Sequence, residues 1–325
     1  MQNILITGIT GQDGIFLVDR LMKSYSDINI LGVSRNKDQE NFSKKLSTLN
    51  KYNLKNLNLK NINLLDLKEV EKNILKFKPD KIFNLSGPSS VYESILYPEK
   101  TMNEICKIFE NITQTLISND LFVPFFQASS SEMFGQNANE CLNETIQFNP
   151  NSPYAKAKLI NHEKVIDYSS KYNWNIYSGI MFNHESEFRN HKYLFMKVIN
   201  SANLIKNKKV KKLTIGSLDY KRDWSFAADV VEGIIRIMEK GKNSCYVIGS
   251  GVSYSIENLV ETVFEYYGLD WKKYVDVDEK LLRQGDPKEV YSDPKILKDE
   301  FGWKCNYTFY DLIDRCIKKN YYKSE

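Results

Sequence analysis

A glycine-rich turn between an apolar strand and an apolar helix constrains this chain more than any other segment. The turn reads Gly8-Ile9-Thr10-Gly11-Gln12-Asp13-Gly14, with strand-like residues 3–7 before it and helix-like residues 15–24 after it. The first glycine permits a tight turn, the second lets the backbone approach a pyrophosphate, and the third lets the helix pack close to the strand. The free N–H groups at the helix N-terminus bind anions. This order predicts a dinucleotide-binding loop rather than a glycine-rich turn without a ligand.

The end of the second strand indicates which dinucleotide binds. The apolar run 28–33 ends in Ser34-Arg35-Asn36-Lys37, where an NAD site usually places an acidic residue for the ribose hydroxyl. Arg35 and Lys37 suit the additional phosphate of NADP instead. A solvated basic turn is the alternative interpretation. The sequence therefore favours NADP as the cofactor.

Composition excludes several classes of protein. With 325 residues and 42% hydrophobic content, the chain can bury a core as one large or two modest domains. The net charge of +4 is the small difference between 45 basic and 41 acidic residues, so nucleic acid is not an expected partner. The basic run 206–212 is interpreted as a solvated face, with attraction of phosphates or a membrane surface as the alternative.

Cysteine and histidine usage gives no sign of a metal site. Five cysteines are scattered without a Cys-x-x-Cys spacing, and there are only three histidines. This pattern is typical of a reducing compartment. The N-terminus has no signal-peptide pattern, and no apolar stretch reaches the roughly 20 residues of a membrane helix. We expect a cytoplasmic protein that does not enter a membrane.

Strand and helix signals alternate through the first half of the chain, which is typical of a doubly wound parallel sheet. Strands are predicted at 3–7, 28–33, 57–64, 81–85, 124–129 and 175–182, and helices at 15–24, 68–77, 99–118 and 153–171. Later predictions are helices at 194–205 and 227–239, strands at 212–215 and 245–248, and a mostly helical tail from 255 with loops at 276–293.

These signals predict an α/β fold in two parts. Residues 1–182 form a Rossmann-type, doubly wound parallel sheet that binds NADP, and residues 183–325 form mainly a smaller α/β substrate-binding lobe. The chain is expected to return to the first part around 220–250. A substrate cleft is then expected above the carboxyl ends of the strands.

A tyrosine and a lysine are spaced for one face of a helix. Tyr154 and Lys158 lie four residues apart, just after Pro153, which suits a helix start. A phenol has a pKa near ~10, and a neighbouring ammonium favours the phenolate. Ordinary surface decoration is the alternative, but a dinucleotide loop in the same chain favours a catalytic acid–base pair.

The predicted strand that ends near Ala128 delivers Ser129-Ser130-Ser131-Glu132 to the carboxyl edge of the sheet. A hydroxyl there can hydrogen-bond a substrate oxygen during oxidation. Glu132 can take a proton from the carbon next to a new carbonyl, because the oxidation raises the acidity of that carbon. The alternative is that Ser131 and Glu132 merely start a helix.

At these motifs the sequence resembles the extended short-chain dehydrogenase/reductase family, and within it the GDP-mannose 4,6-dehydratases. The similarity includes the glycine loop with its Gln-Asp step, the run 127–135, and the Tyr–Lys pair. Phe182-Asn183-His184-Glu185-Ser186 is similar to these dehydratases and unlike the usual epimerase or decarboxylase sequences. Lys221-Arg222-Asp223-Trp224 is a further match.

The resemblance implies a mechanism. Tyr154, supported by Lys158 and Ser130, would take the proton of the sugar C4 hydroxyl while hydride passes to NADP. Glu132 would take the C5 proton, the C6 hydroxyl would leave as water, and the hydride would return to C6. A 4-keto-6-deoxy sugar results.

The resemblance also implies binding residues. Beyond the loop and the Tyr–Lys pair, cofactor contacts are expected from Arg35, Asn36, Asp66, Leu67, Leu85, Ser86, Ser89, His184 and Arg189. Substrate contacts are expected from Ser90, Ser131, Glu132, Asn183, Lys197, Arg222 and Arg283. Arg283 suits a phosphate of the nucleotide diphosphate. The sequence departs from the family at 86–90, 188–189 and 195–197, so the sugar and the oligomeric state stay open. The spacing of the segment 283–290 also differs from the family, so the base stays open, although a GDP-sugar is favoured.

Three alternative functions stay open. A nucleotide-sugar C4 epimerase or 4-ketoreductase would use Tyr154 and Lys158 alone, and superfamily decarboxylases also carry a Ser-Glu step after the active-site strand. A non-catalytic NADP-binding protein is the third alternative. The predicted helices 99–118 and 153–171 resemble those of the superfamily dimer bundle, so we expect a homodimer or homotetramer.

Overall fold

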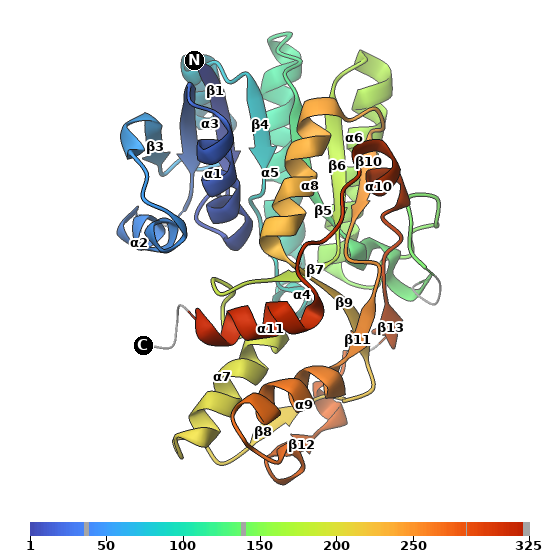
Figure 1. The fold of residues 1–325 in the computed structure, drawn as a ribbon. Helices are drawn as coiled ribbons and strands as arrows, with labels where there is room; N and C mark the ends of the chain where they lie inside the picture. The colour runs from blue at the N-terminus through green and yellow to red at the C-terminus, as the bar shows by residue number, and fades with distance from the viewer. Residues whose placement is uncertain (36–38, 138–140, 284, 321–325) are drawn as a thin grey trace.

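Seven parallel strands form the central sheet of the computed structural model, which describes residues 1–35, 39–137, 141–283 and 285–320. The strand order is β10-β6-β5-β4-β1-β2-β3 (Figure 1). The strands are β1 (Gln2–Thr7), β2 (Ile28–Val33), β3 (Leu57–Lys60), β4 (Lys81–Asn84), β5 (Phe125–Ser130), β6 (Ile176–Met181) and β10 (Cys245–Ile248). The chain moves outward from β1 through β2 to β3, then crosses to β4 on the other side. This reversal places a crevice at the carboxyl ends of β1 and β4.

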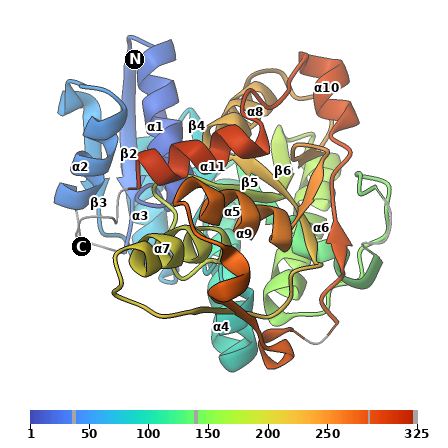
Figure 2. The same ribbon diagram turned by 60° about the horizontal axis from the view of Figure 1, so that its bottom comes forward.

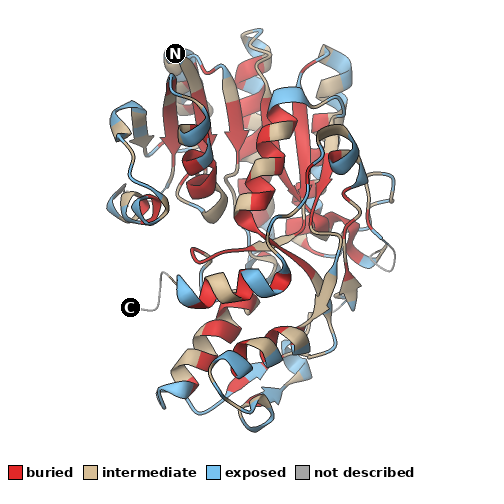
Figure 3. Ribbon diagram, in the orientation of Figure 1, coloured by how far each residue is buried: buried red, intermediate tan, exposed pale blue. Residues whose placement is uncertain are grey.

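Helices cover both faces of the sheet because alternate residues of each strand point to opposite faces. Ile4 and Ile6 of β1 pack in one apolar cluster with residues of α1 (Gln12–Ser24) and α8 (Ala227–Lys240). Leu5 lies in a second cluster, formed with α3 (Leu67–Phe77), α5 (Pro98–Ser118) and α6 (Pro153–Tyr172). Figure 3 shows the buried residues concentrated on the sheet and on the inner sides of these helices.

The predicted doubly wound α/β fold is confirmed. The predicted helices and strands of the first half are present, with ends shifted by a few residues; the third strand ends at Lys60, earlier than expected. The sequence reading missed α2 (Gln39–Leu49) and α4 (Val91–Leu96). The fully buried apolar side chains of α2 are only Phe42 and Leu46. Two apolar residues are too few to show the helical periodicity from which a helix is predicted.

The second lobe contains a small sheet that the sequence reading did not predict. Its order is β11-β9-β13, with β7 also pairing with β9, and β8 and β12 form a separate pair. The strands are β7 (Asn183–Glu185), β8 (Leu213–Ile215), β9 (Lys221–Phe226), β11 (Ser253–Ser255), β12 (Val275–Val277) and β13 (Glu289–Val290). Most have only two or three residues, and β9 begins with charged residues, so the strands of the small sheet give no clear apolar alternation. The strand predicted at 212–215 is present as β8.

Three helices pack together in this lobe, below the carboxyl edge of the main sheet (Figures 1 and 2). They are α7 (Leu194–Lys206), α9 (Ile256–Tyr266) and α11 (Phe309–Lys318), and α10 (Lys295–Phe301) lies against β10. The chain enters the lobe after β6 and comes back to the main sheet at β10. The exact division at residue 182 stays a prediction.

A buried carboxylate joins β9 to two other segments. The Asp223 side chain is fully buried and accepts hydrogen bonds from the backbone N–H groups of Ser250 (2.9 Å), Gly251 (3.0 Å) and Ser292 (3.1 Å). A buried carboxylate is tolerated only when it is paired in this way. Asp223 therefore fixes the small sheet against the loop after β10 and the strand segment before α10.

No helix in the part of the chain that the structure describes is both long and apolar enough to cross a membrane.

The third glycine of the loop gives a prediction about stability. A Cβ at Gly14 would lie 2.3 Å from the Ile9 carbonyl oxygen, and backbone cannot yield easily. We expect Gly14→Ala to reduce the free energy of unfolding in urea by about 3 kcal/mol. Gly302→Ala is the control, because Gly302 has φ +60° but no atom within 4 Å of a Cβ. Its loss should be only about 1 kcal/mol. Equal losses would contradict the close contact.

Candidate active site

The loop after β1 presents bare backbone to the crevice. Gly8 has φ +70°, and a Cβ there would lie 2.8 Å from the Leu85 carbonyl carbon. Gly11 is the N-cap of α1 and is exposed, and a Cβ on it would lie 3.1 Å from the Gly8 oxygen. Glycine at these two positions therefore lets the turn pack tightly, and both glycines line the pocket next to the free N–H groups of α1.

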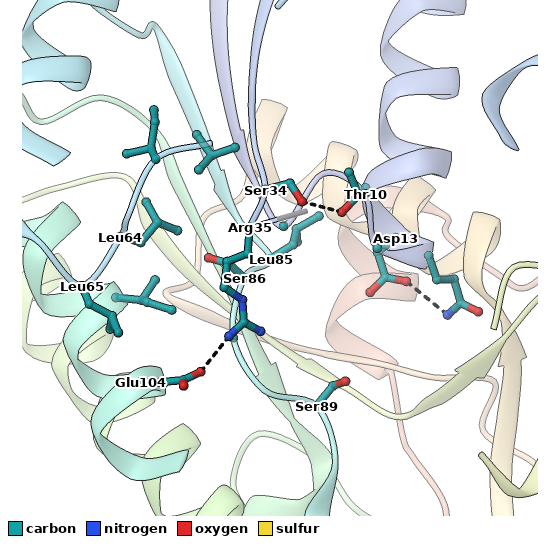
Figure 4. Close-up of a pocket in the computed structure, with 18 of the residues that line it drawn as sticks. Thr10, Asp13, Ser34, Arg35, Leu64, Leu65, Leu85, Ser86, Ser89 and Glu104 are labelled. Carbon is teal, nitrogen blue, oxygen red and sulfur yellow. Dashed lines mark hydrogen bonds and ion pairs between the residues drawn. The ribbon is translucent and has the colours of Figure 1, made fainter. Parts of the chain in front are cut away.

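A pocket of about 400 Å³ opens at this loop (Figure 4). It lies at the crevice where the strand order reverses. Its lining comprises Gly8, Thr10, Gly11, Gln12, Asp13, Gly14, Val33, Ser34, Arg35, Ile62, Asn63, Leu64, Leu65, Leu85, Ser86, Gly87, Ser89, Glu104, Ile108 and Arg189. Apolar walls beside a glycine loop and a helix N-terminus fit a nicotinamide dinucleotide.

Most of the cofactor residues expected from the sequence lie in this lining. Asp66, Leu67, Tyr154 and Lys158 do not. The Asp66 carboxylate instead caps α3, where it accepts from the N–H groups of Lys68 (2.9 Å) and Glu69 (3.2 Å), and the preceding residues 62–65 form the wall. Asn36 and Lys37 lie outside the described residues, so the structure says nothing about their place.

His184 lies behind the loop rather than in the lining. Its Nε2 contacts Asp13 Oδ2 at 3.1 Å and its Nδ1 contacts the Phe182 oxygen at 2.7 Å. Gln12 donates to the His184 carbonyl at 3.1 Å and accepts from the Ser186 hydroxyl at 2.7 Å. The two characteristic motifs of the sequence therefore meet here, with the segment 182–186 bracing the glycine loop.

The contact between His184 Nε2 and the Asp13 carboxylate is an ion pair when His184 is protonated. Burial favours the neutral forms, but the opposite charge and the hydrogen bond outweigh it, so the pKa of Asp13 is lowered and the pKa of His184 is raised.

Arg189 links the far edge of the pocket to the second lobe. Its guanidinium lies 3.7 Å from the ring centroid of Tyr193, whose hydroxyl contacts Ser89 Oγ at 2.8 Å. Its Nε is 3.3 Å from Glu185 Oε2, an ion pair that lacks hydrogen-bond geometry. Burial raises the pKa of Glu185, and the Arg189 charge opposes the shift.

The catalytic pair expected from the sequence is buried on α6. Ser152 caps this helix by accepting from the Ala155 N–H at 3.1 Å, and proline follows at the first helical position. Tyr154 and Lys158 are 8% and 6% exposed. Lys158 Nζ donates to the Ala128 oxygen at 2.7 Å and lies 5.6 Å from the Tyr154 ring centroid.

Burial controls the protonation of both groups. It raises the pKa of Tyr154 to about 12, although a hydrogen bond with Ser130 lowers it in part. It lowers the pKa of Lys158 to about 8, against the charge of Asp13. The expectation that the ammonium brings the phenol toward neutral pH is therefore not met in this structure, because desolvation is the larger effect.

Glu132 lies beside this pair at the end of β5, in a 3-10 turn (Ser131–Asn137). Its N–H donates to Ser130 Oγ at 3.3 Å. Its carboxylate is 3.5 Å from Arg283, which pairs with Asp286 at 2.9 Å, and Asp286 pairs with Arg222 at 2.9 Å. A chain of alternating charges thus connects the catalytic carboxylate to two arginines of the second lobe.

The other expected substrate residues have different surroundings. Ser131 is buried next to Glu132. Ser90 caps α4 by accepting from the Glu93 N–H at 3.1 Å. Asn183 pairs with β9 through the backbone, and Lys197 donates to the Thr214 oxygen at 2.9 Å. The contacts of Ser90, Asn183 and Lys197 are structural, and their roles toward a substrate stay predictions.

The sequence reading missed His162, which lies behind the catalytic strand. Its Nδ1 contacts Ser178 Oγ at 2.8 Å, and Ser178 donates to Ser129 Oγ at 2.7 Å. Burial lowers the pKa of His162 to about 4. The available signal was spacing, since His162 follows Lys158 by four residues and so shares its helix face.

The fold and the site together define the class: this is a doubly wound α/β protein with a pocket at its glycine-rich β1–α1 turn, and the solved structures described below share its fold. A family model described as GDP-mannose 4,6 dehydratase matches residues 5–316. The chain belongs to the GDP-mannose 4,6-dehydratase family.

Curated relatives match over almost the whole chain. "GDP-mannose 4,6 dehydratase 2" of Arabidopsis thaliana is 30% identical, covering 97% of this chain and 86% of the relative. The Drosophila melanogaster "GDP-mannose 4,6 dehydratase" is also 30% identical, covering 97% and 85%.

Solved structures with lower identity share the fold. RMD from Pseudomonas aeruginosa, complexed with NADPH, has a TM-score of 0.80 and 19% identity, covering 98% of this chain and 99% of that one. DesIV, a dTDP-glucose 4,6-dehydratase from Streptomyces venezuelae with NAD and TYD bound, has a TM-score of 0.84 and 19% identity, covering 98% and 96%.

The buried histidine predicts a pH dependence of stability. The pKa of His162 is about 4 in the folded state, against 6.5 for an imidazole in water, so below pH 6.5 the unfolded chain takes up a proton that the folded protein does not. Between these values His162 should reduce the free energy of unfolding by about 1.4 kcal/mol per pH unit as pH falls. His162→Gln should remove this contribution and flatten the slope in urea unfolding experiments.

His191→Gln is the control, because His191 is exposed, and it should keep the wild-type slope. A His162→Gln variant with an unchanged slope would contradict the buried, neutral state of this imidazole.

Proposed function

We propose that the protein is an NADP-dependent nucleotide-sugar 4,6-dehydratase that converts GDP-mannose, or a related GDP-sugar, into a GDP-4-keto-6-deoxy sugar and water. Membership of the GDP-mannose 4,6-dehydratase family and the names of the full-length relatives support the reaction and the substrate. The observation that carries the proposal is Glu132 at the end of β5, whose N–H donates to Ser130 Oγ at 3.3 Å and whose charge acts on the buried Tyr154, because elimination needs a second base that simple oxidoreduction does not.

The first step uses Tyr154 and Ser130. Tyr154 acts in its phenolate form, which takes the proton of the C4 hydroxyl and becomes a phenol, and the Ser130 hydroxyl favours the phenolate because it lowers the pKa of Tyr154 in part. Lys158 holds its position through the Ala128 oxygen and places a charge near the ring. The bound nicotinamide supplies the hydride acceptor for C4 and the hydride donor for C6. Burial of the pair keeps water away from the reacting groups.

The second step uses Glu132. Once C4 is a carbonyl, the C5 proton is acidic, and the carboxylate takes it. The C6 hydroxyl leaves, and the proton and hydroxide that are lost together amount to one water. Hydride return to C6, and protonation of C5 by the proton that Tyr154 took from the C4 hydroxyl, then give the product, so the cofactor has no net change in redox state.

The choice of NADP rests on Arg35 at the end of β2, where an NAD site usually has an acidic residue. The fold alone does not choose, since the solved structures cited above contain NADPH in one case and NAD in the other. Assembly into a homodimer or homotetramer and a cytoplasmic location also stay predictions from the sequence.

Incubation of the purified protein with GDP-mannose and a panel of other nucleotide sugars tests this function. Mass spectrometry should show the loss of one water from a GDP-sugar. Glu132→Gln, which keeps the size of the side chain, should still oxidise C4 and so accumulate enzyme-bound reduced nicotinamide, seen by its near-ultraviolet absorbance, while water loss falls at least about 100-fold.

Tyr154→Phe should show neither the reduced nicotinamide nor water loss, because it acts at the first step. An isomerised or reduced sugar without water loss would contradict the proposal and favour the C4 epimerase or 4-ketoreductase alternative. Normal water loss by Glu132→Gln would exclude the carboxylate as the base.

A further inference from the structure

A carboxylate stands opposite the arginine on which the choice of NADP rests. Glu104 on α5 lines the cofactor pocket, and its Oε2 accepts from Arg35 Nη1 at 3.1 Å. Figure 4 shows the Arg35 side chain reaching from the end of β2 toward Glu104. The two walls of the pocket are thus joined by an ion pair.

The two partners differ in how freely they can move. The Glu104 side chain is 12% exposed, and the neighbouring residues Ile105 and Ile108 on α5 are buried. The Arg35 side chain is 76% exposed. The carboxylate is therefore a fixed negative charge in the pocket wall, while the exposed guanidinium can turn away from it toward a bound phosphate.

This charge acts on a bound phosphate. NAD sites of this fold place an acidic residue beside the ribose hydroxyls, and NADP sites place an arginine beside the 2′-phosphate. Here the end of β2 supplies the arginine, and α5 supplies an acidic group within hydrogen-bond distance of that arginine. A 2′-phosphate must compete with Glu104 for Arg35, whereas a 2′-hydroxyl has no charge and is compatible with the intact pair.

We propose that Glu104 is a specificity-determining residue for the cofactor: by holding Arg35 it reduces the preference for NADP over NAD, so that both dinucleotides bind. This inference rests on the proposed cofactor pocket but not on the sugar substrate. Part of the cofactor specificity is thereby assigned to α5, which is far in sequence from the end of β2, where NAD and NADP are usually distinguished.

Titration of the nucleotide-free protein with NAD⁺ and with NADP⁺, without any sugar, tests the proposal. Glu104→Gln keeps the shape of the side chain and removes the charge. We expect the ratio Kd(NAD⁺)/Kd(NADP⁺) to rise about 10-fold, mostly through tighter NADP⁺ binding. The affinity for NAD⁺ should change less than about threefold, which also shows that the variant has folded with an intact pocket.

Glu110→Gln is the matched control. It removes the same charge from α5, but Glu110 is half-exposed and pairs with Lys107 at 3.2 Å outside the pocket lining. The ratio of the two dissociation constants should keep its wild-type value in this variant.

The Arg35→Gln variant tests whether Glu104 changes the ratio of dissociation constants through its contact with Arg35. In Arg35→Gln, the additional Glu104→Gln change should alter the ratio less than about threefold, because no guanidinium is left to release. An unchanged ratio in the single Glu104→Gln variant, or an undiminished effect in the Arg35→Gln background, would overturn the proposal. Absence of binding of both nucleotides to the wild type would overturn the cofactor pocket itself. Failure of water loss with normal nucleotide binding would affect only the sugar reaction.

Discussion

The backbone of the β1–α1 turn lies in direct contact with the turn after β4, and the rest of the site depends on this contact. The contact requires glycine at Gly8, where a side chain would collide with backbone atoms of Leu85. Gly14 is required for another reason, because a side chain there would collide with the Ile9 backbone within the turn itself. The same turn is held from the other side by the Asp13–His184 ion pair, which ties the first residues of the second lobe to the cofactor loop. The cofactor pocket and the entry to the substrate lobe are therefore positioned by one packed element.

Desolvation sets the chemistry at the catalytic groups. Burial moves the pKa of Tyr154 up and that of Lys158 down, so each group favours its neutral form more than it does in water. Glu132 has different surroundings, because its side chain is partly exposed and its carboxylate lies 3.5 Å from Arg283. One buried pair with a hydrogen-bonded serine and one charged carboxylate give the site two distinct proton-transfer groups. A dehydratase needs two such groups, whereas an enzyme that only oxidises or reduces C4 needs one.

The sequence predicted those parts of the fold and the site that depend on residues close together in the chain. The glycine turn, the apolar strands of the main sheet and the Tyr–Lys spacing each follow from neighbouring residues. The small sheet around β9 was not predicted, because its two- and three-residue strands are stabilised by partners distant in the chain, such as the contacts of Asp223. The same limit applies to the site: the Arg35–Glu104 pair joins residues 69 positions apart, and the burial that shifts the pKa of Tyr154 is a property of the folded chain.

The fate of the C4 hydrogen tests the central claim most directly. GDP-mannose deuterated at C4 would be converted by the enzyme, and the product examined by NMR. If one site oxidises C4, eliminates water and reduces C6 with the same cofactor, the deuterium must appear at C6 of the 4-keto-6-deoxy product. Deuterium that stays at C4 of an isomerised sugar, or that accumulates on free reduced cofactor, would contradict the account.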